Sequence, residues 1–132
     1  MAGGAKAVAS GDELVQAVCA LATGLKLETR EQYKVAKRIW GADRKIDVVL
    51  RRPDTGKVLG VECKFQEVTG TAEEKIPTTI QDISAWPIEG IVVFSGAGFT
   101  ANMRGFLIST GKAVAFEDLE PWLRLYFGLP LT

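Results

Sequence analysis

The sequence contains no histidine and only two cysteines, and these shortages exclude several classes of enzyme. Without histidine the chain cannot be a serine–histidine hydrolase, an HExxH zinc enzyme or a nuclease that uses a histidine base. Cys19 and Cys63 lie far apart and form no CxxC motif, so we expect neither a disulfide framework nor a thiolate zinc site. Any proton or charge chemistry must therefore rest on carboxylates, lysines, arginines, tyrosines or a metal ion.

The chain also lacks net charge and long apolar runs. Sixteen basic residues balance sixteen acidic ones, so the net charge does not indicate a protein that binds nucleic acid or a membrane surface. The longest uncharged stretch, Gly90 to Met103, is shorter than the roughly 20 apolar residues of a membrane span. Met1 to Ser10 lacks the apolar core of a secretory signal. We therefore expect no membrane partner and a reducing, cytoplasmic (intracellular) location.

A length of 132 residues with 47% hydrophobic residues suits a single domain at 11–132 after a loose N-terminal tail at 1–10. Periodicity and turn signals predict helices over 12–23, 71–85, 100–110 and 120–127, and strands over 33–40, 45–51, 58–66, 90–95 and 112–116. Thr71 and Glu74 form a capping box for the second helix, which either kinks at Pro77 or begins there. The order α-β-β-β-α-β-α-β-α predicts an α/β (α+β) fold with a mixed β-sheet flanked by helices.

The second and third strands flank Pro53-Asp54-Thr55-Gly56, a sequence that predicts the turn of a β-hairpin. We expect the turn to close symmetrically, so that Arg52 faces Lys57. One face of the hairpin then carries three apolar cross-strand pairs, namely Ile46 with Cys63, Val48 with Val61 and Leu50 with Leu59. A slip of one residue would break every pair, so the pattern specifies the register.

The opposite face of this hairpin brings like charges together, with Asp47 opposite Glu62 and Lys45 opposite Lys64. Two carboxylates at about 4.5–5.5 Å repel by about 3 kcal/mol at an effective dielectric constant near 20. Protonation of one acid, a solvated arrangement with the lysines, or a divalent cation such as Mg²⁺ would each relieve this repulsion. Gly60 shares the face and permits a close approach to the backbone, which favours a functional cleft.

Asp47 is followed after fourteen residues by Glu62-Cys63-Lys64 on the next strand, and this pattern resembles the PD-(D/E)xK nuclease superfamily. The resemblance extends over about residues 12–95 in topology and implies a restriction-endonuclease-like fold. Ile46 stands where the name of the family has proline, a position that varies widely among its members.

The resemblance implies roles for individual residues. Asp47, Glu62 and Lys64 would be catalytic, with Mg²⁺ or Mn²⁺ held by Asp47, Glu62 and the backbone carbonyl of Cys63. Lys64 would orient or help deprotonate the attacking water and offset charge on the phosphate. Strand alternation places Gln66 on the same face as Glu62, so it is a possible accessory residue. Glu13 is a second possible accessory residue, although an acid at a helix N-terminus more often serves the helix dipole.

The positive charge is concentrated over residues 34–57, which carry eight basic and three acidic residues. Such a stripe suits a phosphodiester backbone, but it also suits a solvated sheet edge. The candidate DNA-binding residues are Lys34, Lys37, Arg38, Arg44, Lys45 and Arg51. Trp40 would stack on a base or belong to the core.

Gly96-Ala97-Gly98 lies between a predicted strand and a predicted helix. It lacks the further glycine of a dinucleotide fingerprint and the lysine of a P-loop, so it predicts a tight turn rather than a nucleotide site.

Together these patterns predict a Mg²⁺-dependent endodeoxyribonuclease that hydrolyses phosphodiester bonds with a metal-activated water. Its resemblance to small resolvases and to phage or repair endonucleases implies a homodimer or higher homo-oligomer. The alternative is a non-cleaving nucleic-acid-binding or interaction module on the same fold.

Overall fold

The computed structural model describes residues 10–37, 43–67 and 72–131, with the backbone alone for 36–37, 43–44 and 72–76. The elements are α1 (Gly11–Gly24), β1 (Glu28–Lys37), β2 (Asp43–Arg51), β3 (Val58–Phe65), α2 (Ala72–Ser84), β4 (Gly90–Ser95), α3 (Ala101–Ser109), β5 (Ala113–Ala115), the 3₁₀-helix η2 (Phe116–Asp118) and α4 (Leu119–Phe127). The predicted order of helices and strands is confirmed, and η2 is an addition to it. Pro77 lies inside α2 rather than at its first position.

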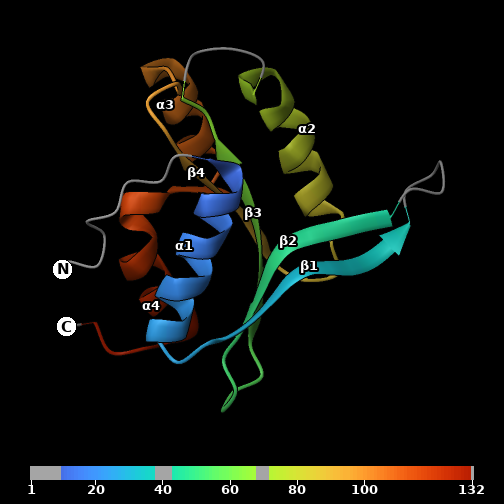
Figure 1. Ribbon diagram of the computed structural model, residues 1–132, viewed down its shortest axis with the longest axis vertical. Helices are drawn as coiled ribbons and strands as arrows, with labels where there is room; N and C mark the ends of the chain where they lie inside the picture. The colour runs from blue at the N-terminus through green and yellow to red at the C-terminus, as the bar shows by residue number, and fades with distance from the viewer. Residues whose placement is uncertain (1–9, 38–42, 68–71, 132) are drawn as a thin grey trace.

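The five strands form one mixed sheet in the order β1-β2-β3-β4-β5. β1, β2 and β3 are antiparallel neighbours, whereas β3, β4 and β5 run parallel. The parallel half requires crossovers, which α2 and α3 supply, and the predicted mixed sheet is therefore confirmed. Figure 1 shows that the outer ends of β1 and β2 extend away from the body of the molecule as a two-stranded arm.

The hairpin between β2 and β3 closes as predicted. Arg52 N–H donates to Lys57 O over 2.9 Å, and Gly56 N–H donates to Arg52 O over 2.8 Å. Gly56 has a φ of 76°, a conformation that glycine adopts without steric cost. The tip is also attached to the C-terminal helix, because the Arg52 guanidinium donates to the carbonyl of Phe127.

The predicted register holds from the turn to Val48, which pairs with Val61, and the described β2–β3 ladder ends there. The expected pair of Ile46 with Cys63 is wrong. Val48 packs in the core that contains Cys63, whereas Ile46 packs in a second core on the opposite face of the sheet. In β1, Gln32 lies between the pairs Glu31–Val48 and Tyr33–Ile46 and has a φ of 52°, so the backbone of β1 is irregular at this level. The register of β1 and β2 shifts further along, between Lys34 and Ala36.

Two apolar cores lie on the two faces of the sheet. The first core contains residues of α1 and α4 packed on β2, β3 and β4, among them Leu14, Leu50 and Leu123. The second core contains residues of α2 and α3 packed on the other face, among them Ile83, Phe94 and Leu107. Ser10 begins α1 by accepting a hydrogen bond from Glu13 N–H, so it belongs to the helix, and residues 1–9 of the expected tail lie outside the described part.

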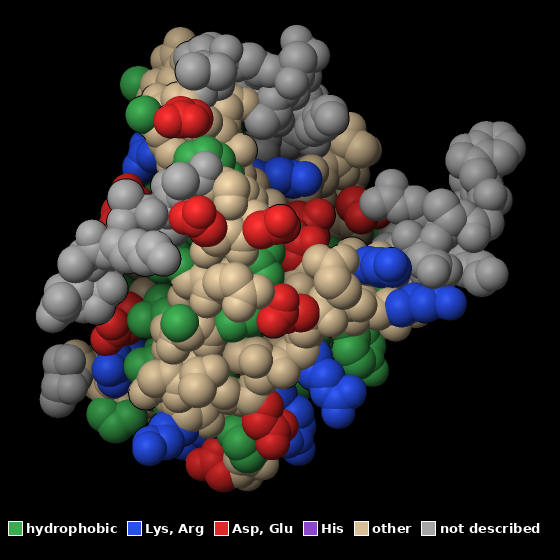
Figure 2. Space-filling model, in the orientation of Figure 1, with side chains coloured by type: hydrophobic (Ala, Val, Ile, Leu, Met, Phe, Trp, Pro, Cys, Tyr) green, Lys and Arg blue, Asp and Glu red, His purple; other side chains and the backbone are tan. Residues whose placement is uncertain are grey.

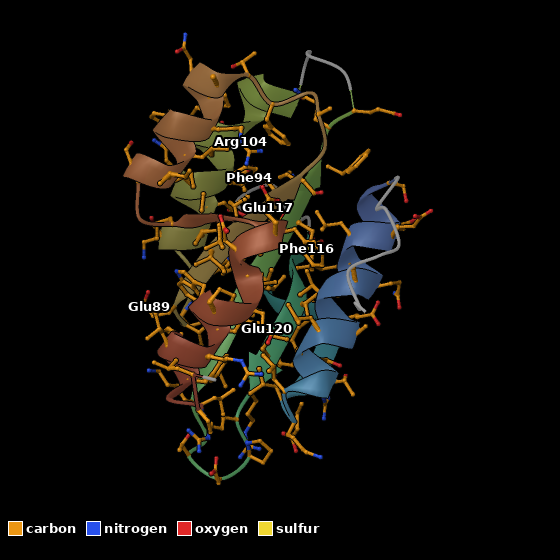
Figure 3. The ribbon with its side chains drawn as sticks, turned by 90° about the vertical axis from the view of Figure 1, so that its left-hand side faces the viewer. Glu89, Phe94, Arg104, Phe116, Glu117 and Glu120 are labelled. Atoms are coloured by element: carbon orange, nitrogen blue, oxygen red, sulfur yellow. The ribbon has the colours of Figure 1, made fainter. Side chains whose placement is uncertain are left out.

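The parallel edge of the sheet is covered by α3 and η2. The Arg104 guanidinium lies over the Phe94 ring at 5.1 Å and pairs with Glu117 at 2.9 Å. Figure 3 labels these three side chains, which lie near one another. These contacts connect α3, β4 and η2. No helix within the described ranges is long and apolar enough to cross a membrane.

Trp86, just after α2, packs directly on two glycines of the sheet. A Cβ added at Gly60 would lie 2.7 Å from the Trp86 ring, and a Cβ added at Gly90 would approach the same ring more closely still. Because Gly60 precedes Glu62 by two residues on the same face, this packing sets how closely α2 approaches Glu62.

We expect Gly60→Ala to lower the free energy of unfolding by about 1–3 kcal/mol, because the added methyl overlaps the indole ring. Gly105→Ala is the matched control, since nothing lies within 4 Å of a Cβ at this position in α3. The control should raise stability by about 0.5–1 kcal/mol through helix propensity. Urea unfolding measures both values, and a Gly60→Ala protein as stable as the wild type would contradict the packing described here.

Candidate active site

The candidate site lies where β2 separates from β3. Beyond Val61, β3 continues to pair with β4 as far as Phe65, but its other edge is no longer paired with β2 in the described ladder. The Cys63 N–H on that edge donates instead to Asp47 Oδ2 over 2.9 Å. The side chain of Asp47 therefore replaces a backbone partner and is fixed against the strand that carries Glu62 and Lys64.

Glu62 lies beside Asp47 and Lys64 in a largely buried position. Its Oε2 is 3.9 Å from Lys64 Nζ, and it accepts a hydrogen bond from the Asp47 backbone. The pKa of Glu62 is raised to about 7, mainly by burial and further by repulsion from Asp47, whereas Lys64 opposes the rise. Among the described residues, Glu62 Oε1 is buried and has no hydrogen-bond partner. The site thus contains an acid whose negative charge is only partly offset by nearby positive charge and hydrogen-bond donors.

Helix α2 and the segment directly after it each add one residue to the surroundings of this acid, and neither residue was predicted from the sequence. Asp82 raises the pKa of Glu62 further through its negative charge. Trp86 covers Gly60 and contributes the apolar wall on that side. Neither residue belongs to a local motif, and only the position of α2 on the sheet brings them here. Figure 2 shows acidic side chains gathered between α1, α2 and the base of the arm, with basic side chains on the arm next to them.

The site offers oxygen ligands of the kind that hard divalent cations prefer. In an extended strand the N–H and C=O of one residue point to the same edge, so the Cys63 carbonyl faces the gap that its N–H shares with Asp47. Two carboxylates that repel each other, one of them with an orphaned buried oxygen, fit a cation bound between them. Within the described ranges no group of three or more His, Cys, Asp or Glu side chains surrounds a common point. A cation here would therefore keep part of its hydration shell.

The two expected accessory residues, Glu13 and Gln66, differ in their exposure to solvent. Glu13 is exposed in the first turn of α1. Gln66 is buried, and its Nε2 donates to Gly98 O over 2.8 Å. The predicted tight turn at residues 96–98 is confirmed, with a φ of 111° at Gly96.

The basic stripe of the sequence divides into two groups in space. Lys34 and Lys45 are exposed and face each other across β1 and β2 on the arm, with Lys45 two residues from Asp47. Arg51 lies at the other end of β2 and pairs with Glu28 at 2.8 Å. Lys37 and Arg44 lie on the arm, where the structure describes their backbone, whereas Arg38 and Trp40 lie outside the described residues.

The raised pKa of Glu62 makes stability depend on pH. The folded protein binds this proton more tightly than the unfolded chain, whose glutamate has a pKa near 4.5, so the free energy of unfolding falls as pH rises from about 4.5 to about 7. We expect Glu62→Gln to raise the free energy of unfolding of the metal-free protein by about 2–3 kcal/mol at pH 8 and by much less at pH 4.5. Urea unfolding at both pH values in EDTA tests this, and an equal effect at the two pH values would contradict it.

A family model described as the PD-(D/E)XK nuclease superfamily domain matches residues 6–120. No curated protein matches the chain. Among solved structures, a protein of unknown function, AF1548, aligns with a TM-score of 0.54 and 17% identity over 78% of this chain and 56% of its own. A repair endonuclease from Pyrococcus abyssi aligns with a TM-score of 0.46 and 12% identity over 83% of this chain and 47% of its own. The chain therefore spans about half the length of these structures, and the likeness to AF1548 concerns the fold. With most of its length matched by the family model, this chain belongs to the PD-(D/E)XK nuclease superfamily and has its restriction-endonuclease-like fold.

Proposed function

We propose that this chain is a metal-dependent DNA endonuclease that hydrolyses phosphodiester bonds. The observation that carries the proposal is the convergence of Asp47 and Glu62 on the gap between β2 and β3, with Glu62 Oε1 buried and unpartnered among the described residues. Membership in a nuclease superfamily supports the hydrolytic chemistry. The absence of histidine leaves carboxylates, lysine and a metal ion to carry it.

Asp47, Glu62 and the Cys63 carbonyl would hold Mg²⁺ or Mn²⁺. When bound, the ion would lower the pKa of a coordinated water and stabilise negative charge on the phosphate. Asp47 is suited to this position because its carboxylate is already oriented by the Cys63 N–H. Glu62 is suited because a cation offsets the unfavourable burial that raises its pKa.

Lys64 would act on the same phosphate from the next position on this face of β3. Its side chain is largely buried, and its ammonium lies 3.9 Å from Glu62. A fixed positive charge at this place would orient the attacking water and offset the charge that develops on the phosphate oxygens in the transition state.

The arm of β1 and β2 supports DNA as the substrate. Lys34 and Lys45 are directly opposed and exposed on this arm, so two positively charged side chains lie where they would contact a phosphate backbone. Because Lys45 is two residues from Asp47, a strand seated on the arm would have its backbone next to the two acids. Cleavage of both strands of a duplex needs two sites, which a homodimer would supply.

We expect the wild-type chain to nick DNA in Mg²⁺ or Mn²⁺ and Lys64→Met to lower the rate by about 100-fold or more, because a charge that stabilises the transition state is lost. Lys112→Met is the matched control, since Lys112 pairs with Glu89 on the parallel side of the sheet. Plasmid nicking and cleavage of duplex, flap and junction substrates measure the effect. A wild-type chain that binds all these substrates equally with and without metal and cuts none of them is a non-cleaving binding module instead.

We expect Mn²⁺ to raise the melting temperature of the wild-type protein by several degrees, since a cation at 100 times its dissociation constant stabilises the fold by about 2.7 kcal/mol. Asp47→Asn should abolish this gain, because the amide keeps an acceptor for the Cys63 N–H but removes a charged ligand. Asp54→Asn in the hairpin turn is the control and should keep the gain. Differential scanning calorimetry with and without Mn²⁺ gives the shifts, and an undiminished shift in Asp47→Asn would rule out this site for the cation.

A further inference from the structure

The face of β3 that carries Glu62 and Lys64 continues to a third polar residue, Gln66. The Gln66 N–H donates to Ser95 O over 3.0 Å, so its backbone extends the pairing between β3 and β4. Because side chains alternate along a strand, Glu62, Lys64 and Gln66 point to the same side of the sheet. Lys64 therefore has one oxygen-bearing side chain two residues before it and another two residues after it.

The side-chain amide of Gln66 is held in one orientation. Its Nε2 donates to Gly98 O over 2.8 Å, and Gly98 N–H donates back to Gln66 O over 2.8 Å. A carbonyl oxygen accepts but does not donate, so the amide nitrogen must face Gly98 and Oε1 must face elsewhere. Gly96 allows this close contact, since a Cβ there would overlap the Gln66 carbonyl.

The orientation leaves Gln66 Oε1 as a buried acceptor without a donor. Gln66 is 6% exposed, and in the part of the chain that the structure describes Oε1 accepts no hydrogen bond. Buried side-chain oxygens in folded proteins nearly always have a partner, so this oxygen is available to a donor that arrives in another state of the protein.

Lys64 carries suitable donors. Its Nζ lies 3.9 Å from Glu62 Oε2, which is within range for an ion pair but too long for a hydrogen bond. Once Glu62 holds a divalent cation, as the proposed function requires, the positive charge of that cation opposes an ammonium at the same oxygen. A second acceptor on its face of the strand would then hold the lysine in a defined place.

We propose that Gln66 is a positioning residue that receives the Lys64 ammonium on its Oε1 when Glu62 is occupied by a divalent cation. This inference rests on the proposed function and adds a defined location for the lysine. Residues two apart on a strand are separated by about 6.5–7 Å, which is within reach of the flexible four-carbon stem of lysine. The hydrogen bond to Gly98 O fixes the acceptor, so the ammonium is held in one place beside the cation.

A double-mutant cycle on Mn²⁺ affinity tests this proposal without depending on cleavage. Gln66→Met is made in the wild-type and in the Lys64→Met background, and calorimetry gives the dissociation constant of Mn²⁺ for all four proteins. We expect Gln66→Met to weaken Mn²⁺ binding by about 5–10-fold when Lys64 is present, because the ammonium then stays beside Glu62 and competes with the cation. In the Lys64→Met background the effect of Gln66→Met should be less than about 2-fold.

Gln66→Glu separates the proposed role from simple support of the Gly96–Gly98 turn. This variant keeps an oxygen acceptor for Lys64 but loses the donor to Gly98 O, and urea unfolding measures the structural cost of that loss. We expect it to bind Mn²⁺ about as well as the wild type when Lys64 is present, even if the protein is less stable. Equal losses from Gln66→Met in both backgrounds, or losses in Gln66→Glu that match those in Gln66→Met, would overturn the proposal.

The outcome also distinguishes this inference from the proposed function. Coupling between Gln66 and Lys64 in a protein that binds Mn²⁺ but cuts no DNA supports the positioning role and refutes the nuclease activity. Additive effects in a protein that cleaves DNA refute the positioning role alone. A wild-type protein that binds no Mn²⁺ refutes both.

Discussion

Where β2 turns away from β3, the Cys63 N–H would lose its partner, and an unpaired buried N–H costs about 1–3 kcal/mol. The Asp47 carboxylate provides the missing acceptor at 2.9 Å. One side chain therefore ends the antiparallel ladder and is held against the strand that carries Glu62. The separation of the two strands removes the backbone partner of Cys63, and the bond that compensates for the separation fixes the first acid of the site.

The second acid is governed by the packing of α2 on the face of the sheet to which Glu62 points. Trp86 can approach β3 closely because Gly60 has no side chain, and the resulting packing of α2 takes the neighbourhood of Glu62 out of water. Burial is accordingly the largest cause of the raised pKa of Glu62, ahead of the charge of Asp47. In the metal-free protein the burial of the Glu62 carboxylate beside Asp47 is electrostatically unfavourable, and a bound cation would offset this.

The sequence pattern predicted the order of elements, the mixed sheet and the hairpin register near the turn, because each depends on local periodicity and on turn residues. It failed at Ile46, since an apolar residue satisfies either core and alternation alone does not reveal where a strand bends. Asp47 and Glu62 were placed together on the assumption of a continuous ladder, whereas the structure brings them together because the ladder stops. Asp82 enters the site through the packing of α2, which no local pattern encodes.

The bend in β2 helps to fix the position of Asp47, the first acid of the site. Residues on either side of Asp47 are buried in different cores, Ile46 in one and Val48 in the other, and both are fully enclosed. A one-residue slip of the strand would withdraw apolar side chains from both layers at once, at a cost of about 1.5–3 kcal/mol for each. A shift of β2 along its neighbours is thus unfavourable on both faces of the sheet. The position of the Asp47 carboxylate is therefore maintained by the burial of two apolar side chains that take no part in the chemistry.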